Sequence, residues 1–109
     1  MEFYKFSKYS GKKILKFNSD FIMSRIIQTD KPTNIGCMYL DENGSVGYHQ
    51  AVVPQLLLIL NGEGYVRNEK DNYFNVEAGD AVFWDKDEWH ETKTKVGLTA
   101  IGLLNEFGL

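Results

Sequence analysis

Hydrophobic and polar residues alternate over short runs along this chain, a pattern typical of strands that bury one face. No window of ten or more residues carries the i, i+3, i+4, i+7 spacing of an amphipathic helix. Eleven segments are predicted to be strands, namely residues 4–6, 14–17, 21–28, 35–41, 46–50, 55–61, 64–67, 73–77, 81–84, 88–94 and 98–105. Turn-forming residues separate many of them, as at 42–44, 61–64 and 78–80. Short strands at hairpin spacing predict an all-β sandwich or barrel.

The strand that begins at Gln55 differs from the others because five apolar residues in succession, 56–60, follow it. A strand that is apolar on both faces needs cover on both sides. The barrel interior would cover one face, and another layer or a partner subunit would cover the other. We therefore expect a homodimer.

Composition predicts a single globular domain over residues 1–109, with 43% hydrophobic, 14% aromatic and 25% charged residues. A net charge of −3 provides no basic field, so we expect neither nucleic acid nor an anionic membrane as a partner. A small molecule remains as the expected partner. No apolar run is long enough for a membrane span or a signal peptide, and the only cysteine, Cys37, agrees with a reducing compartment. The sequence thus predicts a cytoplasmic protein, with Cys37 as a small buried hydrophobe.

Only two histidines occur, His49 and His90, and each lies in a strand-like stretch. Alternation places Ala51 on the same strand face as His49. Gln55 opens the next strand after Pro54 and returns to that face, and His90 is predicted to point inward from its own strand. We therefore expect His49, Gln55 and His90 to converge on one interior pocket. The competing interpretation is that each histidine is only a hydrogen-bonded core residue.

The spacing around these histidines resembles the two motifs of the cupin superfamily. The first motif reads Gly, five residues, His-x-His, three or four residues, Glu, six residues, Gly; the second reads Gly, five residues, Pro-x-Gly, two residues, His. This chain shows, in order, His49-x-Ala51, three residues, Gln55, six residues, Gly62, and then Gly79, five residues, Asp85-x-Asp87, two residues, His90. Asn43 stands where the leading glycine is expected. The resemblance covers about residues 35–105 and is closest to small, mostly uncharacterised single-domain cupins with a Trp-x-x-x-Glu-Trp-His-Glu-like second motif, here residues 84–91.

The resemblance implies an antiparallel double-stranded β-helix, the jelly-roll barrel of cupins, with iron, manganese, nickel or zinc in its interior. His49 and His90 match two of the metal ligands, Gln55 stands in the place of the glutamate, and Ala51 replaces a histidine. Two imidazoles and a neutral amide form a weaker site than three imidazoles and a carboxylate, because the anionic ligand is lost. Glu63, Glu88 or Cys37 would complete the site if the fold brought one of them close.

Two functions follow from the resemblance. In the first, the pocket binds a small polar metabolite through a transition metal held by His49, Gln55 and His90, and a catalytic version would be a metal-dependent dioxygenase or isomerase. In the second, the barrel is a non-catalytic module that binds or senses a metabolite without metal. A blander third possibility is a structural barrel that binds nothing.

Overall fold

The computed structural model describes residues 1–70 and 72–105, and nearly all of its regular secondary structure is β-strand, as the alternation predicts. Asp71 and residues 106–109 of the predicted domain lie outside the described residues, and the single domain over 1–109 stays a prediction. The strands are β1 (Glu2–Lys5), β2 (Lys12–Ile14), β3 (Phe21–Met23), β4 (Thr33–Leu40), β5 (Ser45–Gln50), β6 (Gln55–Arg67), β7 (Phe74–Glu77), β8 (Asp80–Trp84), β9 (Trp89–Lys93) and β10 (Leu98–Asn105). Two short 3-10 turns, η1 (Lys8–Ser10) and η2 (Lys16–Asn18), flank β2.

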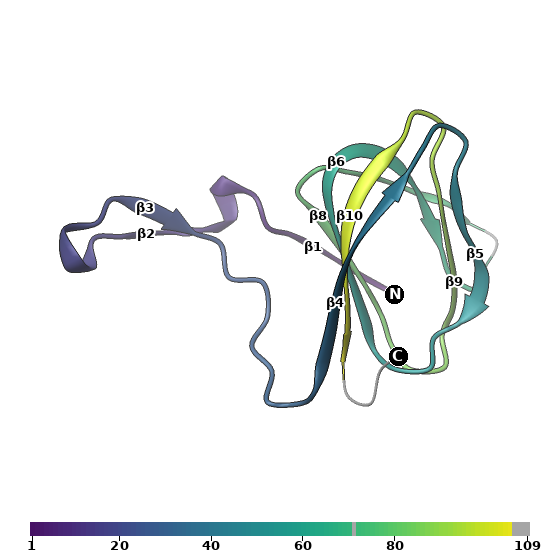
Figure 1. The fold of residues 1–109 in the computed structure, drawn as a ribbon, viewed down its shortest axis with the longest axis horizontal. Coiled ribbons are helices and arrows are strands. Elements are labelled where there is room, and N and C mark those ends of the chain that lie inside the picture. The colour runs from purple at the N-terminus through teal and green to yellow at the C-terminus, as the bar shows by residue number, and fades with distance from the viewer. Residues whose placement is uncertain (71, 106–109) are drawn as a thin grey trace.

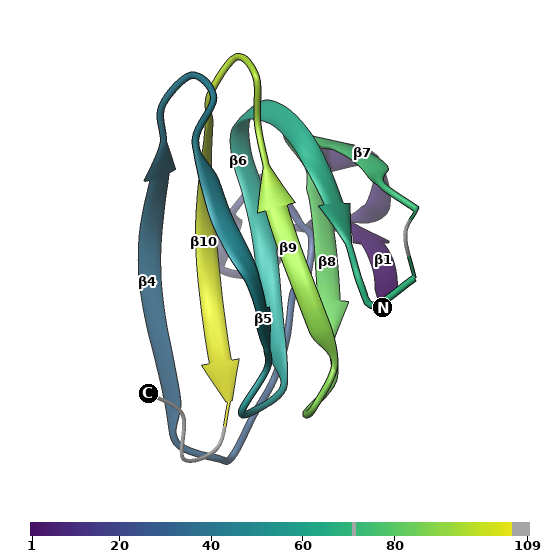
Figure 2. The ribbon, with the colours of Figure 1, turned by 90° about the vertical axis from the view of Figure 1, so that its right-hand side faces the viewer.

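The barrel has two antiparallel sheets that share the long strand β6. One sheet has the order β1-β8-β6-β10-β4, and the first half of β6 forms its centre. In the other sheet, the second half of β6 pairs with β7 and β9, and β9 pairs with β5. Figure 2 shows β4, β10, β6, β8 and β1 side by side, with β5 and β9 in front of them. This is the jelly-roll arrangement expected from the sequence.

The predicted turn at residues 61–64 is wrong, because β6 runs unbroken from Gln55 to Arg67. Gly62 adopts a φ of +81°, and the register of β10 against β6 shifts between Thr99 and Ala100. The strand therefore bends at Gly62 and passes from one sheet into the other, as strands do at sandwich corners. The glycine-rich stretch supplies a bulge within a strand rather than a hairpin turn.

The core lies between the two sheets and is formed by residues from both. It contains Leu57, Ile59, Val66, Val76, Val82, Trp84, Leu98 and Ala100. A second cluster lies on the outer face of the five-stranded sheet and contains Leu56, Leu58 and Ala81, with the partly buried Phe6, Phe83, Ile101 and Leu103. Odd and even residues of the apolar run in β6 thus pack on opposite faces of the sheet, as alternation requires.

Cys37 is exposed, so its expected burial is wrong. It lies on β4, an edge strand, where its neighbour Met38 packs against the core and Cys37 therefore points to the outer face. Alternation identified the two faces of this strand correctly but did not show which of them the fold covers.

The segment between β1 and β4 leaves the barrel. Figure 1 shows the β2–β3 hairpin extended away from the two sheets, to the left of the view. The strand predicted at 14–17 is found at Lys12–Ile14, since η2 occupies residues 16–18, and the strand predicted at 21–28 begins as expected but ends at Met23. No helical segment in the described part of the chain has the length and hydropathy needed to cross a bilayer.

Candidate functional site

His49 and His90 face each other across neighbouring strands. His49 on β5 pairs directly with His90 on β9, and their ring centroids are 4.3 Å apart. Residues directly opposite each other on antiparallel strands have side chains on the same sheet face, so the two rings share one environment. The fold thus brings together two histidines that are far apart in the sequence.

Backbone carbonyls orient both imidazoles. Nδ1 of His49 lies 2.7 Å from the carbonyl oxygen of Gly47, and Nδ1 of His90 lies 3.3 Å from that of Glu88. A carbonyl oxygen accepts only, so each Nδ1–H is the donor, and in the neutral form of either ring the lone pair is on Nε2. A histidine in this state can bind a metal or accept a proton through Nε2.

The two histidines differ in their exposure to solvent. His49 is exposed, whereas His90 has only 3% of its surface accessible and stacks on Trp84 with ring centroids 4.5 Å apart. Burial lowers the pKa of His90, and the nearby His49 lowers it further, against an opposing effect of the Glu88 carbonyl. His90 is therefore a neutral imidazole at pH 7.

Gln55 joins the pair at the same cavity. It opens β6 directly opposite Trp84 on β8, and it is half-buried. His49, Gln55 and His90 all line a cavity of about 180 Å³, so the structure brings the three expected residues together. The other lining residues are Met38, Val46, Leu56, Leu57, Trp84, Thr92, Gly102, Leu103 and Leu104, which make most of the wall apolar. His49 is exposed, whereas His90 and Thr92 are buried, so only part of the polar lining is open to solvent.

Trp84 also lines the cavity, although it was not among the residues expected there. Its Nε1–H is buried without a hydrogen-bond partner among the described residues, and only 2% of its surface is accessible. A buried donor without an acceptor is costly, and in native proteins it often marks a place where a ligand or water supplies one. No sequence pattern separates such a tryptophan from an ordinary core residue.

The additional metal ligands considered from the sequence do not reach this cavity. Glu63, Glu88 and Cys37 are absent from its described lining, and Ala51 is fully buried in the loop after β5. Glu88 instead accepts hydrogen bonds from the backbone N–H of Asp85 and from other groups near it. No group of three or more His, Cys, Asp or Glu residues in the described chain is arranged to hold a metal ion. The donors at this cavity are therefore two imidazoles and one amide.

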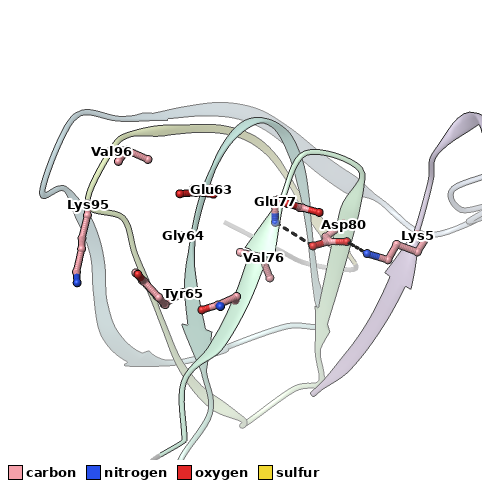
Figure 3. Close-up of a pocket in the computed structure, with 10 residues that line it drawn as sticks. Lys5, Glu63, Gly64, Tyr65, Val76, Glu77, Asp80, Lys95 and Val96 are labelled. Atoms are coloured by element: carbon pink, nitrogen blue, oxygen red, sulfur yellow. Dashed lines mark hydrogen bonds and ion pairs between the residues drawn. The ribbon is translucent and has the colours of Figure 1, made fainter.

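A larger, polar cavity of about 350 Å³ lies outside the core, where β6, β7 and the β9–β10 loop meet. Figure 3 shows Asp80 between Lys5 and the backbone of Glu77, with both interactions drawn as dashed lines. Asp80 is buried and fixes the tight turn before β8, which agrees with its sequence interpretation as a turn former. Its carboxylate is satisfied within the chain, so the histidine cavity is the better candidate.

Comparisons with known proteins support the fold. No protein-family model matches the sequence, and no curated protein matches it. Solved structures do match: a cupin superfamily protein from Desulfitobacterium hafniense has a TM-score of 0.64 at 18% identity over 74% of this chain and 72% of its own. A predicted oxalate decarboxylase from Thermotoga maritima has a TM-score of 0.64 at 20% identity over 90% of this chain and 93% of its own.

A third similar structure is the DMSP lyase DddQ from Ruegeria pomeroyi. Its TM-score is 0.65 at 22% identity, and the match covers 72% of this chain but only 40% of the lyase. At such identities the likeness shows the fold alone. The expectation of a cupin-type jelly roll is confirmed.

Proposed function

We propose, from this cupin-type fold and its cavity, that the protein binds a small acidic metabolite through a divalent transition metal held by His49, Gln55 and His90. The observation that carries the proposal is the cross-strand pair of imidazoles, whose ring centroids are 4.3 Å apart, in the wall of a cavity that Gln55 also lines. Both Nδ1 atoms are turned toward backbone carbonyls, which leaves both Nε2 atoms for a ligand.

The donor set fits a metal ion that keeps open coordination positions. Two neutral imidazoles and an amide oxygen provide three donors of the kind that zinc, iron, nickel and manganese accept. These donors carry no negative charge, so an anionic ligand is the complementary partner. When bound, the metal would act as a Lewis acid toward an oxygen of that ligand. His90 stays neutral at pH 7 because burial lowers its pKa, and a neutral imidazole is the form that binds metal.

The size of the cavity limits the metabolite. An apolar cavity of about 150 Å³ can hold benzene, so the cavity of about 180 Å³ fits a molecule of roughly six to eight non-hydrogen atoms. Its apolar wall suits a short hydrocarbon body, and a metal held by the histidines suits a carboxylate. The unpartnered Nε1–H of Trp84 supports a ligand that also carries a hydrogen-bond acceptor.

A second candidate is a metal-free module that binds or senses the same acid. It is favoured by the neutral Gln55 and by Ala51, which stand where the cupin motif has a glutamate and a histidine. In this function the Gln55 amide would donate a hydrogen bond to the acid, and Nε2 of a neutral histidine would accept one from a hydroxyl or protonated carboxyl group of the ligand. A homodimer and cytoplasmic residence stay predictions beside both candidates.

Metal content tests the first candidate. The protein is purified without a histidine tag and incubated with zinc, iron, nickel or manganese, and bound metal is measured by elemental analysis after gel filtration. We expect one metal per chain, lost in His49→Ala and His90→Ala and reduced in Gln55→Ala. Gln50→Ala is the matched control, since its side chain hydrogen-bonds the backbone of Asp87 and does not line the cavity. If the variant that carries both His49→Ala and His90→Ala binds as much metal per chain as wild type, the site is refuted.

Thermal unfolding with a series of short carboxylic acids separates the two candidates. A ligand at about 100 times its Kd stabilises a protein by about 2.7 kcal/mol, which raises the Tm of a domain of this size by roughly 10 °C. A shift that requires added metal supports the metal site. A shift of the metal-free protein that His90→Ala abolishes supports the module, and no shift with any acid under either condition contradicts both.

A further inference from the structure

The segment from Ser7 to Arg25, called the arm here, exposes an unusual amount of apolar surface. It contains η1, β2, η2 and β3, and Figure 1 shows its hairpin clear of the two sheets. Phe17 is 97% exposed and Leu15 is 64% exposed at its tip. The arm also exposes Tyr9, Phe21, Ile22 and Met23.

This arm lacks the means to stabilise itself. Its two strands have three residues each and pair only with one another among the described strands. An isolated two-stranded hairpin is at best marginally stable in water. Phe17 adopts a φ of +59°, an unfavourable conformation for a bulky residue that persists only when its surroundings hold it. The arm therefore needs a surface to pack on.

A matching uncovered surface lies on the outer face of the five-stranded sheet. On the edge strand β4, Ile35 is 68% exposed, and Cys37 and Tyr39 on the same face are exposed as well. The face continues inward through the partly buried Ile101 and Leu103 of β10. We call these five residues the outer face.

The chain that returns from the arm leaves an apolar groove beside this surface. Ile26 and Ile27 lie along a cavity of about 350 Å³ whose floor is Leu56 and Leu58 of β6, next to β10. Both isoleucines stay nearly half exposed, so the chain itself covers this part of the sheet only in part. The uncovered surface is thus continuous from the root of the arm to the edge strand β4.

We propose that the arm of one copy packs on the outer face of a second copy in a twofold symmetric dimer. The second arm packs on the first copy in the same way, so the dimer contains two equivalent contacts. In such an interface each copy offers the same two complementary patches. The apolar tip of the arm would cover β4 and β10 of the partner. This goes beyond the cavity function and does not depend on it.

Charge favours a second copy as the occupant. Residues 7–25 carry five basic side chains and one acidic one, a net charge of +4. The rest of the chain carries seven basic and fourteen acidic side chains, a net charge of −7, which gives the overall −3. A basic arm is attracted to the acidic body of another copy, and such complementarity promotes association.

Light scattering after gel filtration tests the proposal on the full chain. We expect a mass of about 25 kDa, twice the 12.5 kDa of one chain, at micromolar concentration. A mass of one chain overturns the proposal. If that monomer also floats with vesicles containing phosphatidylserine, the basic apolar arm is a membrane anchor instead.

Substitutions on the two patches locate the interface. Leu15→Asp in the arm and Ile35→Asp on the outer face should each raise the dimer Kd about 100-fold, because each places a charge against apolar surface. Val96→Asp is the matched control: Val96 is 61% exposed but belongs to neither patch, so its dimer should persist. A dimer that survives both patch substitutions overturns the proposal, and circular dichroism checks that each variant folds.

Thiol chemistry gives a second readout of whether the outer face is covered. Cys37 is exposed in the single chain, so the wild-type dimer should react slowly with a thiol reagent and the Leu15→Asp variant quickly. Equal rates would mean that nothing covers the outer face. Metal content measured on the same variants should match wild type, which separates a failure of the dimer from a failure of the cavity function.

Discussion

Replacing Gly62 by alanine tests the bend that lets β6 serve both sheets. A Cβ at this position would lie 2.2 Å from the carbonyl oxygen of Gly97 and 2.8 Å from Cα of Leu98, both backbone atoms. The backbone of β6 and the start of β10 would therefore have to separate. Gly62 also has a φ of +81°, a conformation that residues with a side chain rarely adopt.

The expected cost combines three effects. Left-handed backbone at a residue with a Cβ costs about 1–2 kcal/mol. Forcing a methyl group into filled space costs about 1–3 kcal/mol, and the loss of chain entropy in the unfolded state returns about 0.4–1 kcal/mol. We therefore expect Gly62→Ala to lower the free energy of unfolding by about 2–4 kcal/mol, and the Tm by roughly 10–15 °C.

Urea unfolding followed by circular dichroism measures this change, with Gly36→Ala as the control. Gly36 also lies within a strand, but no atom lies within 4 Å of its added Cβ. That variant should stay within about 0.5 kcal/mol of wild type or gain slightly. If Gly62→Ala and Gly36→Ala unfold at the same urea concentration, the glycine is not what permits the bend, and the reasoning fails.

Three further predictions concern the cavity. The pKa of His90 is lowered in the folded state, so the unfolded chain binds more protons at acidic pH. The free energy of unfolding should therefore keep its full value above the unfolded pKa of about 6.5. Below that pH it should fall, by at most about 1.4 kcal/mol per pH unit. Urea unfolding at a series of pH values should show a slope that is weaker in His90→Gln, and an unchanged slope would count against a buried neutral imidazole. Trp84→Phe removes the unpartnered N–H, so it should weaken acid binding about 5–10-fold, as measured by titration calorimetry. An unaltered affinity would mean that the indole donates no hydrogen bond to the ligand. Leu57→Ala enlarges the cavity and should lower the free energy of unfolding in urea by about 2–5 kcal/mol. Acids with one or two more carbons should then bind more tightly. If the shorter acids remain preferred, Leu57 does not limit ligand size.

The sequence predicted the fold class and most strands because alternation is a local property. It also predicted that His49, Gln55 and His90 would meet, since their spacing resembles the two cupin motifs and each lies on a strand. The exposure of His49 did not follow from that spacing, because strand periodicity fixes a face but not the distance from the cavity mouth.

Other features depend on contacts between distant segments. The glycines near Gly62 gave the same local signal as a hairpin turn, and only pairing with β10 makes them a bend within a strand. Cys37 was placed inside because its neighbours are apolar, yet the edge position of β4 leaves its face uncovered. Trp84 became a cavity residue only through its pairing with Gln55.

The two walls of the histidine cavity differ in how firmly their strands are held. Among the described strands, β5 is bonded only to β9, whereas β6 has neighbours on both sides. Fraying of β5 would therefore separate His49 from His90 while Gln55 stays in place. Amide hydrogens of β5 should exchange with solvent faster than those of β6, and a ligand bridging both rings should slow them. Entry of a ligand and assembly of its site would then be one local motion.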